Sequence, residues 1–346
     1  MIEVTGLSKK YGSHLAVNDV SFSIKKGEVV GFLGPNGAGK STIMNILTGY
    51  LSMTKGKVEI DGYNIVNNPE DAKRRIGYLP EIPPLYIDMK VREYLNFIYD
   101  LKKVKFPKRP HIDEIMKLVK IDHVENRLIK NLSKGYRQRV GFAQALIGNP
   151  DVLILDEPTV GLDPKQIIEI RNLIERLGKN HTIILSSHIL SEIQSVCERV
   201  IIINQGELVA DDTPDNLSAK LSKDNSLVVR VTGDEAEMLS ALASVKGVET
   251  VKSLGKKEAG SCDFNVVPKE GCDVRADIVK RVADRRKTLL MLSSNELSLE
   301  HIFLRLTEAG SNEEARKLLG LNEEVAPAAP VISPEEIIIP ESEEEQ

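Results

Sequence analysis

A nine-residue stretch near the start of the chain limits what it can fold into more than any other feature. It reads Gly34-Pro35-Asn36-Gly37-Ala38-Gly39-Lys40-Ser41-Thr42 and fits the pattern G-x-x-x-x-G-K-S/T, in which backbone N–H groups cradle phosphate oxygens. An apolar, β-branched run at 28–33 predicts a buried strand before it, and 41–48 can form a helix that ends at Gly49. Strand, glycine loop and helix therefore come in the order that a phosphate-binding loop needs.

Residues 34–42, called the phosphate loop below, have side chains suited to a nucleoside triphosphate. The glycines let the backbone wrap a phosphate group, and the following helix adds the partial positive charge of its N-terminus. Lys40 can reach the β- and γ-phosphates, and the Ser41 hydroxyl can ligate Mg²⁺. A glycine turn ahead of an ordinary helix is the alternative, which the full spacing and its context disfavour.

A second apolar run, 152–155, ends in the two carboxylates Asp156 and Glu157. Open α/β sheets bind ligands at the carboxyl ends of their strands, so this pair is expected beside the phosphate loop. Asp156 can hold Mg²⁺, directly or through water, and Glu157 can accept a proton from water that attacks the γ-phosphate. The two motifs together predict hydrolysis of a nucleoside triphosphate with Mg²⁺ as cofactor.

The spacing of apolar residues divides the chain into regions of different character. Residues 1–27 alternate like an antiparallel sheet, 88–148 have helical spacing, and strands resume at 152–155 and 182–185. This pattern predicts an α/β nucleotide-binding domain over 1–222, with an antiparallel β subdomain and a helical insert at about 88–148. Tyr11 lies in a loop of the first region, where it can stack on adenine or be an ordinary half-buried tyrosine.

The rest of the chain predicts a second domain and a tail. Residues 226–308 follow the order strand, helix, strand, strand, helix, strand, which is the ferredoxin-like α+β motif. Residues 323–346 are rich in proline and glutamate and contain no Lys or Arg, so they predict a disordered acidic tail.

Composition narrows the classes of partner. The net charge of -5 depends on eight glutamates of the tail, so the folded part is nearly neutral, and only 4% of residues are aromatic. Neither value favours direct binding of nucleic acid. The apolar runs fall short of the ~20 residues that span a bilayer, no secretory signal opens the sequence, and the three cysteines fit a reducing compartment. We therefore expect a cytoplasmic protein that reaches a membrane only through another chain.

The order of motifs over the first 220 or so residues resembles the ATP-binding subunit of an ABC transporter, which has a P-loop NTPase core. The run 132–139, LSKGYRQR, looks like the ABC signature, 159–163 looks like the D-loop, and His188 stands where that family has its switch histidine. The resemblance implies that Tyr11 stacks on the adenine of ATP and that His188 contacts the γ-phosphate. It also implies a head-to-tail pair, a homodimer or a dimer with a paralogous ATPase, in which Ser133 and Gly135 of one subunit close over ATP held by the other.

Two sites depart from the family pattern. In the signature, Lys134 replaces the first glycine and Tyr136 replaces the glutamine, while Ser133 and Gly135 remain. Glu81 stands where the family usually has a glutamine, and a carboxylate there can still meet Mg²⁺ or a water molecule. Ser41, Asp156 and Glu81 are therefore the expected metal ligands.

The resemblance implies a motor subunit for a separate membrane permease, held at the inner face of the cell membrane. The LSKGY signature, the ferredoxin-like domain and the run 298–303 are similar to those of drug, antibiotic or polysaccharide exporters, and the loop at 80–84 with the helix at 88–103 would receive the permease.

The alternative is an ABC ATPase that acts on ribosomes or DNA. Translation-type members carry two cassettes, whereas only one phosphate loop occurs here. Asp156 follows Lys40 by 116 positions, which leaves no room for the coiled coil of chromosome-type members. A regulatory ATPase whose ferredoxin-like domain binds a small ligand is a third possibility, for which Cys262 and Cys272 offer little evidence of a metal site.

Overall fold

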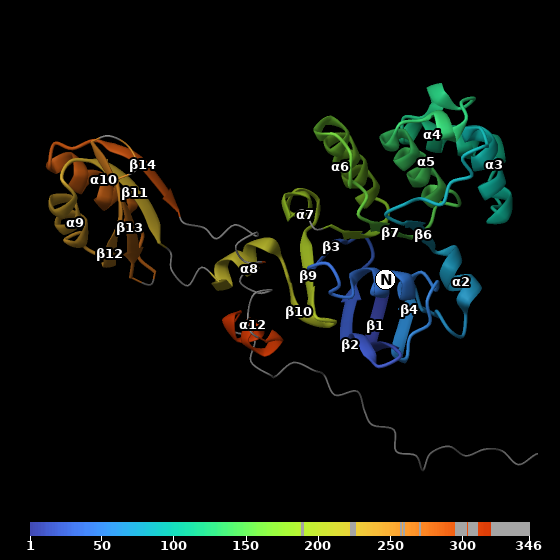
Figure 1. Cartoon of the computed structure of the whole chain (residues 1–346), viewed down its shortest axis with the longest axis horizontal. Coiled ribbons are helices and arrows are strands. Elements are labelled where there is room, and N and C mark those ends of the chain that lie inside the picture. The colour runs from blue at the N-terminus through green and yellow to red at the C-terminus, as the bar shows by residue number, and fades with distance from the viewer. Residues whose placement is uncertain are drawn as a thin grey trace, which may run out of the picture.

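The computed structural model describes residues 1–187, 190–221, 226–256, 258, 260–269, 271–294, 303 and 311–319. Figure 1 shows residues 1–221 as one body, called the cassette below, and residues 227–294 as a second unit. None of the helices within the described ranges is long and apolar enough to cross a lipid bilayer. The predicted tail at 323–346, the run 298–302 and His188 all lie outside these ranges.

The first sheet of the cassette is the expected antiparallel β subdomain. Its strand order is β2-β1-β4-β5, with β1 (Ile2–Tyr11), β2 (His14–Ile24), β4 (Lys55–Ile60) and β5 (Tyr63–Asn64). The alternation read from the sequence is visible in burial, because Ile2 and Val4 of β1 and Phe22 and Ile24 of β2 all lie in the core.

The central sheet has the order β10-β9-β3-β8-β7-β6 and confirms the predicted α/β core. Its strands are β3 (Val29–Leu33), β6 (Ile76–Leu79), β7 (Val152–Asp156), β8 (Thr182–Ser186), β9 (Arg199–Asn204) and β10 (Glu207–Asp212). All neighbours pair in parallel except β9 and β10, which form an antiparallel hairpin. Strands β3, β7 and β8 are buried along their whole length, as expected for parallel strands covered on both faces.

Each face of the central sheet has its own hydrophobic core, and β7 contributes alternately to both. Val152 and Ile154 pack with the β subdomain and the helix that follows the phosphate loop, α1 (Lys40–Leu47). Leu153 and Leu155 pack on the other face with the remaining helices of the cassette core, which are α6 (Pro164–Gly178) and α7 (Leu190–Val196) together with the insert. Two short helices, α2 (Pro69–Arg74) and α8 (Pro214–Leu221), complete the cassette.

Between β6 and β7 the described chain forms helices, in the region read from the sequence as a helical insert. It contains α3 (Val91–Leu101), α4 (Lys108–Leu118), two 3-10 turns (Asp122–Val124 and Ile129–Asn131) and α5 (Lys134–Leu146). Ser133 caps α5 as expected, since its hydroxyl accepts a hydrogen bond from the backbone N–H of Tyr136.

A lysine that the sequence did not single out holds the other end of α5. Lys102 follows α3, and its Nζ donates to the backbone oxygens of Gln144 at 3.1 Å and Ile147 at 2.9 Å. These carbonyls end the helix and have no partner within it, so a cation here satisfies them and complements the helix dipole. Burial lowers the pKa of Lys102 from 10.5 to about 8.

The second unit is an antiparallel sheet of order β12-β13-β11-β14. It consists of β11 (Leu227–Thr232), α9 (Glu235–Ala243), β12 (Val248–Gly255), β13 (Ser261–Pro268), α10 (Arg275–Asp284) and β14 (Leu289–Ser294). Its core, which includes Phe264 and Val229, is a hydrophobic cluster separate from those of the cassette. The last described element, α12 (Asn312–Leu318), packs against β10 of the cassette rather than against this unit.

We expect Lys102 to give the cassette a pH-dependent stability at alkaline pH. Between about pH 8 and 10.5 the unfolded chain keeps a proton on Lys102 that the folded chain has released. The free energy of unfolding of the wild type should therefore rise across this window relative to Lys102→Arg, because a guanidinium stays charged in both states. Urea unfolding at pH 8, 9 and 10 measures this, and equal slopes for the two proteins would contradict it.

Candidate functional site

The phosphate loop joins the end of β3 to the start of α1, which is the strand-to-helix turn expected from the sequence. Gly37 and Gly39 have φ of 81° and 102°, in the left-handed region that favours glycine. A Cβ on Gly39 would also lie 2.7 Å from the backbone oxygen of Ala16. No side chain caps the N-terminus of α1. The first N–H groups of this helix are therefore available to an anion.

The side chain of Lys40 folds back on the first residues of the phosphate loop. Its side chain is buried, and Nζ donates to the backbone oxygens of Gly34 at 2.6 Å and Pro35 at 3.1 Å. Burial lowers the pKa of Lys40, while the nearby carboxylates of Glu157 and Asp156 act in the opposite direction. The ammonium group thus faces two acids from a strand that is far away in sequence.

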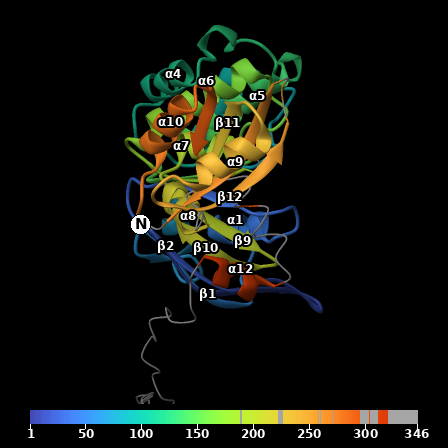
Figure 2. The ribbon, with the colours of Figure 1, turned by 90° about the vertical axis from the view of Figure 1, so that its left-hand side faces the viewer.

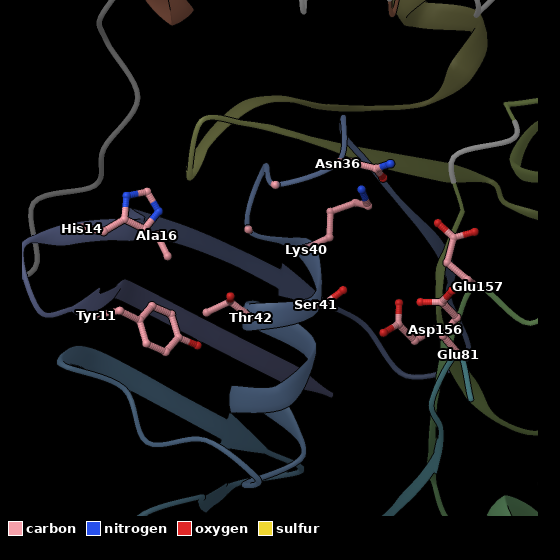
Figure 3. Close-up of a pocket in the computed structure, with 12 residues that line it drawn as sticks. Tyr11, His14, Ala16, Asn36, Lys40, Ser41, Thr42, Glu81, Asp156 and Glu157 are labelled. Atoms are coloured by element: carbon pink, nitrogen blue, oxygen red, sulfur yellow. The ribbon is translucent and has the colours of Figure 1, made fainter. Parts of the chain in front are cut away.

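The residues predicted from separate motifs line one cavity of about 320 Å³, shown in Figure 3. Its lining combines the start of the β subdomain, the phosphate loop and three acidic residues: Tyr11, His14, Ala16, Asn36, Gly37, Gly39, Lys40, Ser41, Thr42, Glu81, Asp156 and Glu157. Of the predicted site residues that the structure describes, those of the signature and the loop residues Gly34, Pro35 and Ala38 are not in this lining.

The three carboxylates form one side of the cavity, and Figure 3 shows them facing Ser41 and Lys40. Asp156 is buried at the end of β7, where its Oδ1 accepts a 2.5 Å hydrogen bond from the Ser186 hydroxyl. The backbone N–H of Glu157 donates to the carbonyl oxygen of Ser186 at 3.2 Å, and Glu157 has a φ of 47°. A left-handed conformation is strained for a non-glycine residue and is typical of functional sites.

Tyr11 lies at the other end of the cavity in Figure 3, beside His14. Tyr11 as a whole is 46% exposed, and the Lys9 ammonium lies 5.2 Å from the centroid of its ring. An aromatic face at one end, a phosphate cradle in the middle and carboxylates at the far end match the parts of a nucleoside triphosphate with its metal. His14 was missed in the sequence, although it pairs with Tyr11 across the β1–β2 turn and could have been found that way.

The signature residues lie at the N-terminus of α5, outside this cavity. Ser133 is exposed, and Gly135 is buried against Gln166, whose side chain leaves no room for a Cβ. The two departures from the family pattern have contacts of their own. Lys134 Nζ lies against Gly161 of the D-loop, and the Tyr136 hydroxyl is 2.9 Å from His123 Nε2. One chain alone therefore does not bring its signature to its own phosphate loop.

A buried acid supports the loop next to the carboxylates, and no sequence pattern marked it. Glu192 of α7 is 2% exposed, and its Oε2 accepts hydrogen bonds from the hydroxyls of Thr159 at 2.5 Å and Ser187 at 3.1 Å. Thr159 belongs to the D-loop and Ser187 follows β8. Glu192 thus joins two segments of the chain: the D-loop, which follows Glu157, and the end of β8, which precedes position 188.

Fold and site define a P-loop nucleotide hydrolase, and comparisons with known proteins identify its family. A family model described as "ABC transporter" matches residues 17–160. The bacitracin transport ATP-binding protein BcrA of Bacillus licheniformis is 41% identical over 64% of this chain and 73% of its own length. The linearmycin resistance ATP-binding protein LnrL of Bacillus subtilis is 33% identical over 89% of this chain and 98% of its own length.

Solved structures agree with these relatives. A dimeric post-hydrolysis state of the ATP-binding cassette MJ0796, bound to ADP and Pi, superimposes with a TM-score of 0.57 at 27% identity over 62% of this chain and 98% of its own. The chain belongs to the ATP-binding proteins of ABC transporters. It is an ATPase, and it acts as the ATP-hydrolysing subunit of a transporter.

We expect Lys40→Ala to reduce ATP hydrolysis by about a hundredfold or more, since it removes the one buried cation of the phosphate loop. Release of inorganic phosphate by the purified chain measures this. Lys55→Ala, at an exposed position of β4, is the matched control and should keep wild-type activity. Turnover that survived in Lys40→Ala would mean that the phosphate loop is not the site of hydrolysis.

Proposed function

We propose that this chain binds a separate integral membrane permease and powers export through it. The observation that carries the proposal is the single cavity in which phosphate loop, aromatic residue and carboxylates converge, in a chain related over almost its whole length to a linearmycin resistance protein. Relatives named for bacitracin transport and linearmycin resistance support export over import. In this proposal the chain works at the inner face of the cell membrane, held there by the permease.

We assign the predicted site residues the following parts in ATP binding. Tyr11 stacks on the adenine, and the backbone of the phosphate loop, from Gly34 to Thr42, wraps the phosphates. Lys40 neutralises charge on the β- and γ-phosphates, and His188 contacts the γ-phosphate. Glu157 accepts the proton of the attacking water, so that hydrolysis depends on positioning and on electrostatic stabilisation.

The residues present also fit a magnesium ion. The Ser41 hydroxyl and the carboxylates of Asp156 and Glu81 are hard oxygen donors that line the same part of the cavity, which is the donor set that Mg²⁺ prefers. When bound there, Mg²⁺ neutralises charge that develops on the phosphate oxygens. The hydrogen bond from Ser186 fixes Asp156 in one orientation toward this position.

The start of the signature helix, where Ser133 is exposed outside the cavity, suits binding to a second subunit. Ser133 and Gly135 at the start of α5 would close over ATP held by the phosphate loop of a partner, either a second copy or a paralogous ATPase. The dimeric state of MJ0796 with ADP and Pi supports this arrangement. Lys134 adds a positive charge at the same helix N-terminus, so the altered signature can still bind an anionic phosphate.

The insert presents an exposed apolar surface that suits a permease helix. Tyr86 and Phe97 are 56% and 37% exposed, with ring centroids 5.4 Å apart, and Ile82 and Ile87 are exposed beside them in sequence. Tyr94 lies behind this surface, and its hydroxyl donates to Gln144 Oε1 of α5 at 2.6 Å. A permease segment bound at α3 would therefore act directly on the helix that begins with the signature.

We further propose that residues 226–308 are a ferredoxin-like domain. The order of its strands and helices and its separate hydrophobic core support this. Function does not follow from this fold alone.

Glu157→Gln should form a stable dimer in the presence of ATP and Mg²⁺, because it binds nucleotide but cannot accept the proton from water. Size-exclusion chromatography with and without MgATP measures the change. The double variant Glu157→Gln with Ser133→Arg should stay monomeric, since the added side chain blocks the signature surface. A Glu157→Gln protein that remained monomeric with MgATP would contradict the proposed arrangement.

The apolar surface can be tested separately from catalysis. Phe97→Ser combined with Tyr86→Ser should lower the fraction of the chain that sediments with membranes of its own cell, while ATP binding by the purified chain stays unchanged. Tyr50→Ser removes an aromatic residue that is 83% exposed elsewhere and is the matched control. Equal membrane recovery of all three proteins would contradict this docking surface.

A further inference from the structure

The phosphate loop is supported from outside by the turn between β9 and β10, residues 204–207. The backbone N–H of Gly206 donates to the carbonyl oxygen of Ala38 at 3.0 Å. Its own carbonyl accepts from the N–H of Asn18 in β2 at 2.8 Å. Gly39 also lies next to the turn, since a Cβ on it would be in van der Waals contact with the Cα of Gly206 at 3.6 Å. Any movement of this turn therefore reaches the backbone that cradles phosphate.

The opposite side of this turn is covered by α12, the last described element of the chain. Figures 1 and 2 both show α12 beside β10. Ala315 and Leu319 are 0% and 3% exposed and belong to the hydrophobic core of the cassette. About 90 residues of sequence separate α12 from α8, the last helix before the second unit, yet α12 packs on the cassette.

Asn312 at the start of α12 forms a reciprocal pair with a buried residue of the turn. Its Nδ2 donates to the backbone oxygen of Asn204 at 3.0 Å, and its Oδ1 accepts from Asn204 Nδ2 at 3.0 Å. Asn204 is 5% exposed. Since a buried amide that loses its partner is costly, this pair fixes α12 to the first residue of the turn.

Arg316 lies four residues after Asn312 in α12 and binds Glu207, the last residue of the β9–β10 turn, and the next residue, Leu208. Its guanidinium donates twice to the backbone oxygen of Leu208, at 2.7 and 3.1 Å, and lies 3.5 Å from the carboxylate of Glu207. Oε1 of Glu207 accepts from Asn18 Nδ2 at 2.9 Å, while Oε2 accepts from Asn312 at 3.3 Å. Glu207 thus connects α12 to Asn18 of β2, and Asn18 lies two residues after the cavity residue Ala16.

We propose that α12 is a clasp that holds the phosphate loop in its nucleotide-binding shape, with Arg316 and Asn312 as positioning residues for ATP binding. The clasp fixes the turn, the turn fixes Ala38 and Gly39, and a preorganised loop loses less conformational freedom when it binds. This inference rests on the phosphate loop being the ATP site.

The first test is the affinity for MgATP, measured by isothermal titration with the full chain. Arg316→Ala and Asn312→Ala should each weaken binding by about fivefold to tenfold, the lower end of a typical coupling between two sites. Arg316→Lys keeps the charge but not the planar fork, so it should lie between Arg316→Ala and the wild type. The control is Glu313→Gln on the exposed side of α12, where Glu313 forms an ion pair with Lys317 of the same helix, and it should bind as the wild type does.

The second test uses the wild type alone, so it does not depend on a variant that folds. Coupling between two sites is reciprocal, and a non-hydrolysable ATP analogue with Mg²⁺ should therefore slow hydrogen exchange in both 204–208 and 311–319. A helix that only adds stability would show no response to nucleotide. Unchanged exchange in 311–319, or equal affinities of Arg316→Ala and Glu313→Gln, would overturn the proposal.

Lys40→Ala separates this proposal from the assignment of the site itself. If Lys40→Ala binds MgATP as tightly as the wild type, the phosphate loop is not the ATP site, and both proposals fail. If Lys40→Ala loses binding while Arg316→Ala and Asn312→Ala keep it, the site is correct and only the clasp is wrong.

Discussion

The phosphate loop keeps its shape because backbone from two distant parts of the chain lies against it. Gly39 has a left-handed φ and packs against Ala16 of the β subdomain, while the carbonyl of Ala38 accepts a hydrogen bond from Gly206. Nine residues of loop could not hold this conformation alone, since ordering each residue costs about 1–2 kcal/mol. The central sheet brings β3 and β9 side by side and so supplies this support.

The same sheet explains why hydrolysis needs parts that are far apart in sequence. Strand β7 lies two places from β3, with β8 between them, and its carboxylates therefore come within reach of Lys40. The signature begins a helix on a separate insert, and the contacts of Tyr94 and Lys102 fix that helix to α3. The signature, which is proposed to bind ATP, and the proposed permease surface on α3 are thus connected through α5 rather than through the central sheet.

The sequence was most informative where function restricts the residue type. The phosphate loop, the carboxylates of 156–157, the capped start of α5 and the α/β core were all predictable, because each combines a residue pattern with a local structure. Lys102, Glu192 and the contacts of α12 were not predictable. Their roles depend on backbone carbonyls or hydroxyls that come near only after folding, and a lone lysine or glutamate carries no spacing that would mark it. His188 lies outside the described residues, so its role stays a prediction.

The strand that carries Asp156 packs on both of its faces. The side chains of Val152 and Ile154 lie in one hydrophobic core, and those of Leu153 and Leu155 lie in the other. Such a strand cannot slide by one residue without exchanging the two sets of side chains between the two cores. The position of Asp156 at the end of β7 is therefore fixed by the packing of the strand on both faces of the sheet. The insert, by contrast, shares a hydrophobic core with only one face of the sheet among the described residues, so its packing does not depend on the β subdomain.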